Sequence, residues 1–211
     1  VDFHIHTDWT DGENSITEMY DAAKKCGLKA ILFSEHVRHT SGDWYESFAD
    51  QVNKIDDKGC KAFVGAEAKA VDFSGKLDCT KAIINRCDLL MGVVHRFPGE
   101  VGNIKKNKAT LTCDEAEELE FELMRGLLKF SPIDILGHPF GMTLKRFKKI
   151  PNINKVIEII KLASERNIMF EINSSYHHNP WKLINLCKKY DASVSLGSNA
   201  HSVLEVGKII K

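Results

Sequence analysis

The feature that most constrains the fold is an alternation of short apolar runs with helical patterns. Between the runs, apolar residues recur at the three- and four-residue spacing of amphipathic helices. Strands that alternate with helices predict an α/β fold with a mostly parallel sheet. Seven runs have the length of a buried strand, namely Val1–Ile5, Ala30–Phe33, Ala62–Val64, Leu89–Val94, Ile133–Leu136, Ile168–Ile172 and Val194–Leu196.

Five helices can be placed between these runs. Ser15 and Glu18 have the spacing of a capping box at the start of the first helix. Asn179 and Pro180 have the pattern of an N-cap and first residue at the start of the last. A basic stretch at 143–149 is either a phosphate-facing patch or a solvated helix end. The three remaining helices are expected around Phe48–Ile55, Ala116–Leu127 and Val156–Ala163.

Length and charge limit the class of protein. The 211 residues fit a single domain over 1–211, and 29 basic residues balance 29 acidic ones. A net charge of zero provides no general field for nucleic acid, so a nucleic-acid partner is not expected. No apolar run approaches the roughly 20 residues of a membrane helix. Six cysteines without a C-x-x-C pair, and no leader sequence, favour reduced thiols in a cytoplasmic protein.

Histidines and carboxylates follow nearly every apolar run. Because the carboxyl ends of parallel strands meet at one end of a sheet or barrel, these side chains are expected to converge. The motifs, in chain order, are His4-Ile5-His6-Thr7 with Asp11-Gly12, Glu35-His36, Glu67, His95, Gly137-His138-Pro139, Glu171 and Gly197-Ser198-Asn199-Ala200-His201.

A convergence of imidazoles and carboxylates favours a metal site. Neutral imidazole suits zinc, manganese and iron, and carboxylates offset their charge. His4 and His6 flank one residue, so on a strand both point to the same face. A single histidine at a strand end is more often hydrogen-bonded or exposed than a ligand, but the repetition predicts two or three ions. His39, His177 and His178 do not fit the pattern and are expected to be non-ligands, although they could line the mouth.

In this order, the motifs resemble the polymerase and histidinol phosphatase (PHP) superfamily, and most of all its stand-alone histidinol-phosphatase-like members. The resemblance extends from His4 to His201. It implies a distorted (β/α)7 barrel, which agrees with the seven predicted strands. It also implies a cluster of divalent ions, usually three, at the carboxyl ends of the strands, with zinc, manganese or iron in varying mixtures.

The resemblance also implies how the ligands are shared. His4, His6, Glu67 and Asn199 would hold the first ion, and Glu67 would bridge to a second ion held by His95 and His138. Asp11, His36 and His201 would hold the third. The family usually has Asp where this chain has Asn199, and an amide is neutral and a poorer ligand. Three explanations are a natural variant that works, a weakened or differently metallated site, and an engineered substitution.

These expectations lead to a mechanistic hypothesis. A hydroxide that bridges two ions would attack the phosphorus of a small phosphate monoester, such as a histidinol-phosphate-like compound, a nucleotide or a sugar phosphate. His36 and His201 are candidates for proton transfer to the leaving group. Arg38 and Arg96 would grip the phosphate, or else lie on the surface. The side chains expected to orient the ligand imidazoles are Asp2, Glu35 and Glu171.

Three alternatives stay open. A phosphodiesterase or 3′ exonuclease is possible because PHP modules accompany DNA polymerases, although the neutral net charge argues against a long nucleic-acid substrate. A non-catalytic metal-binding domain weakened at Asn199 is the second. A metal-dependent C–N hydrolase on a similar barrel is the third, and the amide at 199 counts against it. The sequence leaves the oligomeric state open.

Overall fold

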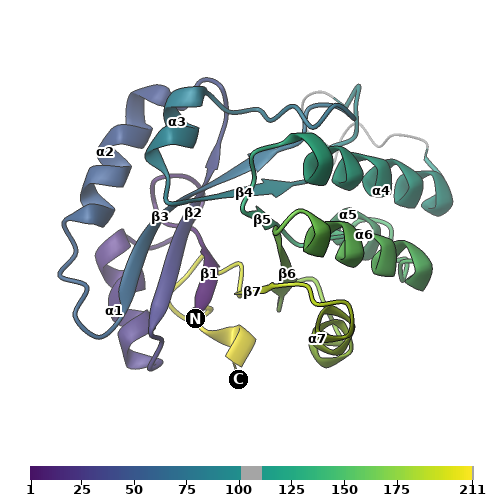
Figure 1. The fold of residues 1–211 in the computed structure, drawn as a ribbon. Coiled ribbons are helices and arrows are strands. Elements are labelled where there is room, and N and C mark those ends of the chain that lie inside the picture. The colour runs from purple at the N-terminus through teal and green to yellow at the C-terminus, as the bar shows by residue number, and fades with distance from the viewer. Residues whose placement is uncertain (101–110, 211) are drawn as a thin grey trace.

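A computed structural model, which describes residues 1–100 and 111–210, shows seven parallel strands paired in chain order from β1 to β7 (Figure 1). The sheet nearly closes, because Ile5 at the end of β1 bridges Ala200 just beyond β7, and the His6 amide donates to the Ala200 carbonyl at 2.9 Å. The predicted distorted (β/α)7 barrel is confirmed. The strands are β1 (Asp2–Ile5), β2 (Ala30–Val37), β3 (Lys61–Lys69), β4 (Leu89–Val93), β5 (Ile135–Leu136), β6 (Met169–Asn173) and β7 (Val194–Gly197).

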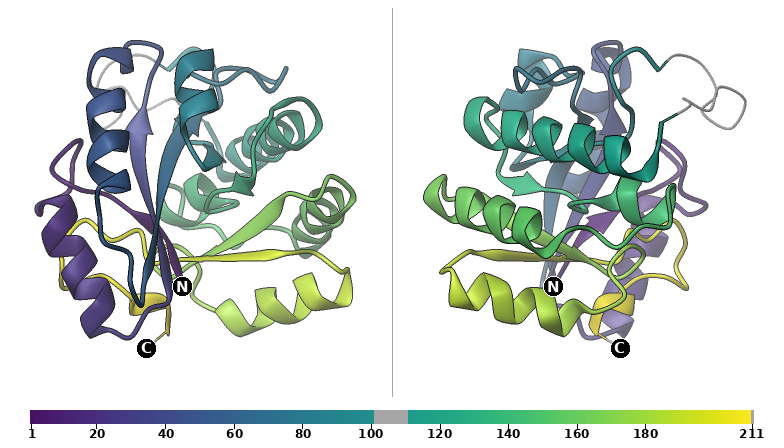
Figure 2. Two further views of the ribbon diagram at one scale, coloured as in Figure 1. Left: turned by 60° about the vertical axis from the view of Figure 1, so that its left-hand side comes forward. Right: turned by 90° about the vertical axis from the view of Figure 1, so that its right-hand side faces the viewer.

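The helices lie around the outside of the strands (Figure 2). Ser15 and Glu18 form the predicted capping box, and the Asn179 side chain caps the last helix. Two helices of six and five residues are additional to the five predicted, because so short a segment shows no helical period. The helices are α1 (Ile16–Lys25), α2 (Gly42–Asn53), α3 (Lys81–Arg86), α4 (Cys113–Phe130), α5 (Gly141–Lys145), α6 (Ile153–Glu165), α7 (Pro180–Lys189) and the 3-10 helix η1 (Lys208–Ile210).

The inward face of the barrel changes from apolar to polar along β2 and β4. Side chains two residues apart share a face of a strand, so Leu32 on β2 and His36 near its end point the same way. On β4, Met91 and Val93 are buried in the barrel floor, and His95 follows them in the same alternation. The apolar half fills the barrel, and the polar half provides the chemistry at its mouth.

β2 and β3 extend furthest beyond the apolar runs that predict them. The expected strand Ala30–Phe33 continues to Val37, and the expected strand Ala62–Val64 continues to Lys69. The polar ends of both strands stay in the sheet because backbone pairing continues there, with Ser34 opposite Gly65 and His36 opposite Glu67. Glu35, His36 and Glu67 are therefore strand residues rather than loop residues.

The basic stretch at 143–149 begins in α5 and continues beyond it. The Arg146 guanidinium donates to Glu100, with an Nη2–Oε1 distance of 2.6 Å, and Lys149 pairs with Asp114 and Glu117. Two of its charges are thus paired with carboxylates, which fits a solvated helix end better than a phosphate-facing patch. The six cysteines form no disulfide. Within residues 1–100 and 111–210, no helix combines the length and apolarity that crossing a membrane requires.

Candidate metal centre

Eight side chains with metal-ligating atoms meet at the carboxyl end of the barrel. They form three overlapping groups, and within each group the ligand atoms lie within 4.8 Å of one another. The structure brings together every histidine and carboxylate that the sequence analysis proposed as a ligand. The groups are His6 with Asp11, His36 and His201, then His4 with Glu67 and His138, and finally His36 with Glu67 and His95.

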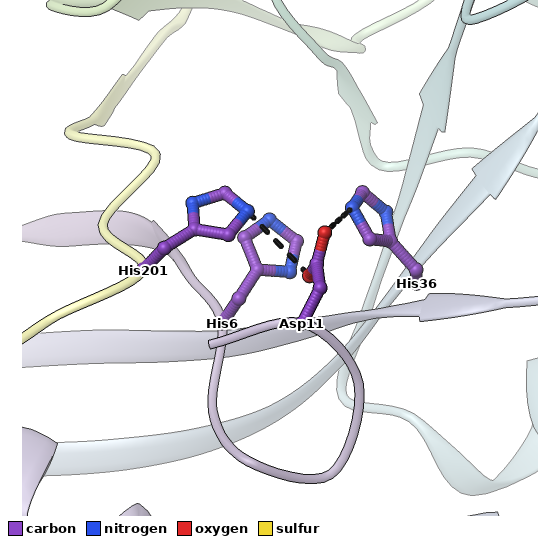
Figure 3. A group of neighbouring side chains, drawn as sticks. All are labelled: His6, Asp11, His36 and His201. Carbon is purple, nitrogen blue, oxygen red and sulfur yellow. Dashed lines mark ion pairs between the residues drawn. The ribbon is translucent and has the colours of Figure 1, made fainter. Parts of the chain in front are cut away.

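The first group joins the two edges of the barrel (Figure 3). His6 follows β1, Asp11 lies in the loop after it, His36 is near the end of β2, and His201 lies in the segment after β7. Asp11 bridges two of the imidazoles, since its Oδ2 lies 3.4 Å from His36 Nε2 and its Oδ1 lies 3.5 Å from His201 Nε2. Asp11 is 53% exposed, so this group faces the solvent.

Glu67 lies at the centre of the other two groups. Its carboxylate, which is fully buried, lies 3.3 Å from His4 Nε2, 3.1 Å from His138 Nε2 and 3.4 Å from His95 Nε2. The same carboxylate contacts His36 Nδ1 and lies 3.8 Å from His6 Nε2. One carboxylate therefore reaches five imidazoles.

Glu171 on β6 orients His4 from behind. His4 Nδ1 donates to Glu171 Oε1 at 2.7 Å, so in neutral His4 the Nε2 lone pair points at Glu67 and at His6 Nε2, 3.1 Å away. The other Glu171 oxygen accepts from the backbone amide of His138. A carboxylate that holds an imidazole in one tautomer is the usual support of a metal-ligating histidine.

Gly197 makes room for this support. A Cβ on Gly197 would lie 2.1 Å from Glu171 Oε1 and 2.6 Å from the His4 Cβ. Only glycine lets β7 pass this close to the His4–Glu171 pair. The glycine of the last motif is thus explained by packing under the metal centre.

His201 is oriented by its own backbone. Its Nδ1 donates to the Asn199 carbonyl at 2.9 Å, and a carbonyl can only accept. The Nε2 lone pair of neutral His201 is therefore directed at Asp11. Asn199 itself is half-buried and has a left-handed backbone with φ of 55°.

The arrangement fits cations better than it fits hydrogen bonding alone. His95 Nε2 and His138 Nε2 face each other at 3.2 Å, and both also face the same Glu67 oxygen. Among the described residues, the buried nitrogens His6 Nδ1 and His138 Nδ1 have no hydrogen-bond partner. Unpartnered buried polar atoms are costly, and lone pairs that converge on one volume are what a divalent ion satisfies.

Charge in the cluster is strongly coupled. Burial would lower the pKa of His4, but the charges of Glu171 and Glu67 raise it to about 10. Burial opposes protonation of His36 too, yet Glu67 and Asp11 raise its pKa to about 10. Burial and the nearby His36 instead hold the pKa of His6 well below its usual range. Without a metal ion, protons on two imidazoles offset the buried carboxylates.

The groups divide the ligands differently from the family-based assignment. His6 lies with Asp11, His36 and His201, whereas the resemblance placed it with His4 on the first ion. His36 and Glu67 each belong to two groups, so the assignment of ligands to individual ions stays a prediction.

Two of the carboxylates expected to orient the imidazoles, Asp2 and Glu35, bind loop residues instead. Asp2 accepts from the backbone and hydroxyl of Ser198 and from the Gly207 amide, and so holds the segment after β7. Glu35 accepts from the Thr7 amide and hydroxyl, each at 2.7 Å, and contacts the Thr10 hydroxyl. Both carboxylates anchor loops that carry ligands. The pleat of β2 directs Glu35 away from its neighbour His36, and the register of β1 shifts between Asp2 and Ile5.

Both proposed arginines line a cavity over the centre. This cavity, of about 250 Å³, is bounded by Glu67 and His95 below and by Arg38 and Arg96 at its rim. Lys69 lines it as well and was not predicted. The spacing from Glu67 could have identified Lys69 in the sequence. Lys69 follows Glu67 by two residues on β3, so the two side chains point the same way.

A ring that the sequence analysis did not single out also borders the centre. Tyr176 stacks on His138 with ring centroids 4.5 Å apart. Two of the histidines expected to be non-ligands have other partners. His177 accepts from the Asn173 amide and donates to the Pro139 carbonyl, both at 3.0 Å, and His39 Nδ1 lies 2.7 Å from Asp78 Oδ1.

Comparison with known proteins agrees with this geometry. A "probable phosphatase" from Caldicellulosiruptor bescii is 26% identical over 99% of this chain and 82% of its own length. The histidinol phosphate phosphatase of Lactococcus lactis, solved with zinc, L-histidinol and phosphate, superposes with a TM-score of 0.70 at 17% identity. That match covers 99% of this chain and 91% of the other.

A candidate histidinol phosphatase from Listeria monocytogenes superposes with a TM-score of 0.78 at 15% identity, over 98% of this chain and 97% of its own. At such identities the two structures show the shared fold. The prediction of a hydrolase agrees with the name of the bacterial relative. The family model of the PHP domain matches residues 2–175, and the chain therefore belongs to the PHP domain family.

Proposed function

We propose that the chain is a metal-dependent hydrolase of small phosphate monoesters. The observation that carries this proposal is the convergence of six imidazoles, Glu67 and Asp11 at the mouth of a PHP-family barrel. The match of nearly the whole chain to proteins named as phosphatases supports the reaction class.

The ligand set suits two or three divalent ions of zinc, manganese or iron. Bound there, such ions lower the pKa of water toward about 7 and offset the charge of the phosphoryl oxygens. We assign their binding to His4, His6, Asp11, His36, Glu67, His95, His138, Asn199 and His201.

The rim of the central cavity supplies the groups that orient the phosphate. Arg38 and Arg96 can each offer two parallel N–H donors to phosphoryl oxygens, a geometry that lysine lacks. In the reaction, a water oxygen bonds to phosphorus and gives up a proton to solvent, while the bond from phosphorus to the ester oxygen breaks. The phosphate lies between the ligand groups and the rim of the cavity, and the alcohol departs toward the open rim.

We propose that His36 and His201 act as ligands rather than as proton donors, and their contacts support this. Both nitrogens of His36 face carboxylates, and both nitrogens of His201 face Asp11 or the Asn199 carbonyl. Neither ring has a nitrogen left for the leaving alcohol. We propose that the alcohol takes its proton from solvent, which reaches the mouth beside half-exposed Asp11.

The test is phosphate release from a panel of phosphomonoesters, with zinc or manganese supplied. His95→Ala removes one ligand and should reduce release by about 100-fold or more, since even supports of ligands cost 10–100-fold. His178→Ala, which removes an exposed imidazole on the α7 side, is the matched control and should keep full activity. Hydrolysis of a phosphodiester but of no monoester would contradict the proposal.

A further inference from the structure

A second cavity opens beside the central one and shares a wall with it. Its volume is about 410 Å³, and Asp11, His36 and Arg38 line both cavities. A molecule whose phosphoryl group lies over the ligands can therefore extend past Arg38 into this second space. We call it the Trp44 cavity, and its further lining residues are Thr10, Thr40, Ser41 and Trp44.

The Trp44 indole is held rigidly at this cavity. It lies in the first turn of α2 and stacks on Trp9 with ring centroids 6.0 Å apart and an interplanar angle of 26°. The Tyr45 and Phe48 rings contact it edge-on, at 5.7 and 6.1 Å. Trp9 is fixed in turn, because its indole N–H donates to Gln51 at 2.9 Å. The indole is thus pre-organised before any ligand arrives.

The remaining lining is polar and short. Thr10, Thr40 and Ser41 contribute hydroxyls, and the Ser41 hydroxyl accepts from the Arg38 amide at 3.0 Å. An aromatic wall with a few polar groups at its edge suits a flat ring that carries hydrogen-bonding atoms. A flexible aliphatic chain would gain little from the rigid indole.

We propose that the Trp44 cavity holds the alcohol part of the substrate and selects phosphate monoesters whose alcohol carries a planar aromatic or heteroaromatic ring. This inference rests on the proposed function and adds a substrate class to it. The phosphate lies in the central cavity, Arg38 marks the junction, and the ring packs against the indole.

A matched pair of substrates isolates the contribution of a planar ring to kcat/KM. Benzyl phosphate and cyclohexylmethyl phosphate have the same carbon skeleton and both release a primary alcohol, so they differ mainly in the planarity of the ring. Wild-type protein should favour benzyl phosphate in kcat/KM by roughly 3- to 10-fold, the range of an aromatic contact. In Trp44→Leu the ratio should fall to about one. Trp181→Leu, which removes an indole that is 73% exposed on α7, should keep the wild-type ratio.

The affinity of analogues that cannot be hydrolysed tests the Trp44 cavity independently of the proposed function. Benzylphosphonate and cyclohexylmethylphosphonate cannot be hydrolysed, and their affinities for the metal-loaded wild-type protein can be measured by calorimetry. If neither ester is hydrolysed, the proposed function fails, and the phosphonate affinities still test the cavity. Equal affinities for the two phosphonates, or a preference that persists in Trp44→Leu, would overturn the inference. If Trp44→Leu does not fold, the wild-type affinity ratio decides.

Discussion

Glu67 is the side chain that links most of the candidate metal ligands. Its buried carboxylate reaches the imidazoles of His4, His6, His36, His95 and His138. Burial would raise the pKa of Glu67, but the surrounding histidines hold it well below the usual range, so the carboxylate is charged. A buried charge with this many neighbouring lone pairs is costly unless cations share the site.

Asn199 stands where the resemblance to the PHP superfamily leads us to expect Asp. Its left-handed backbone, with φ of 55°, is one that Asp adopts as readily as Asn. We expect Asn199→Asp to keep the fold and to tighten metal binding by about tenfold, because it adds a negative charge to a cationic site. The measurement is metal affinity by calorimetry, with phosphate release on the same samples. Unchanged or weaker binding would mean that the centre is adapted to the amide.

At the level of elements, the barrel works by bringing strand ends together. β1, β2, β3 and β4 deliver His6, His36, Glu67 and His95. β6 delivers no ligand of its own, and Glu171 on it instead orients His4 of β1 and holds the His138 amide. The close approach of β7 at Gly197 keeps this pair in place.

Gly197→Ala tests that packing. The added methyl would collide with the Glu171 carboxylate and the His4 Cβ, so we expect a loss of about 1–3 kcal/mol in the free energy of unfolding. Metal affinity should fall as well, because His4 is displaced. Gly42→Ala is the control, since a Cβ there meets nothing within 4 Å at the start of α2. Thermal unfolding and metal titration check both variants, and equal behaviour of the two would contradict the packing argument.

The elements also show what the sequence could predict. The seven strands were predictable because buried parallel strands are apolar on both faces. The ends of β2 and β3 were not, because their inward residues are polar where they face the centre. The identities of the candidate ligands came from motifs at strand ends. The role of Glu171 as a support of an imidazole was predictable too, and the structure shows that the imidazole is that of His4. The grouping of the ligands in space, and the roles of Lys69 and Trp44, depend on contacts between residues far apart in the chain.

On the scale of the whole molecule, the formal charge is zero, and the barrel mouth brings together two carboxylates and six imidazoles. The pKa values of His4 and His36 stand at about 10 without metal, because burial, which would lower them, is outweighed by neighbouring carboxylates. At neutral pH both imidazoles are protonated, and metal ions must displace those protons to bind.

Metal binding should therefore release protons and strengthen as pH rises. Affinity should increase by about tenfold per pH unit for each proton displaced, and this dependence should level off above the two pKa values. Calorimetry at pH 6, 7 and 8, in pairs of buffers with different protonation enthalpies, counts the released protons. Affinity that is independent of pH, with no proton release, would contradict the charge state inferred for the metal-free centre.

The measurement that most directly tests the central claim is phosphate release as a function of bound metal. Protein stripped by a chelator is reloaded stepwise with zinc or manganese, beside Glu67→Gln and the control Glu165→Gln, whose side chain is exposed at the end of α6. We predict that release from a phosphomonoester disappears on stripping and returns with metal in wild type and Glu165→Gln. In Glu67→Gln, release should stay at least about 100-fold lower, with less metal bound. Undiminished release from stripped protein, or from Glu67→Gln without metal, would contradict the account.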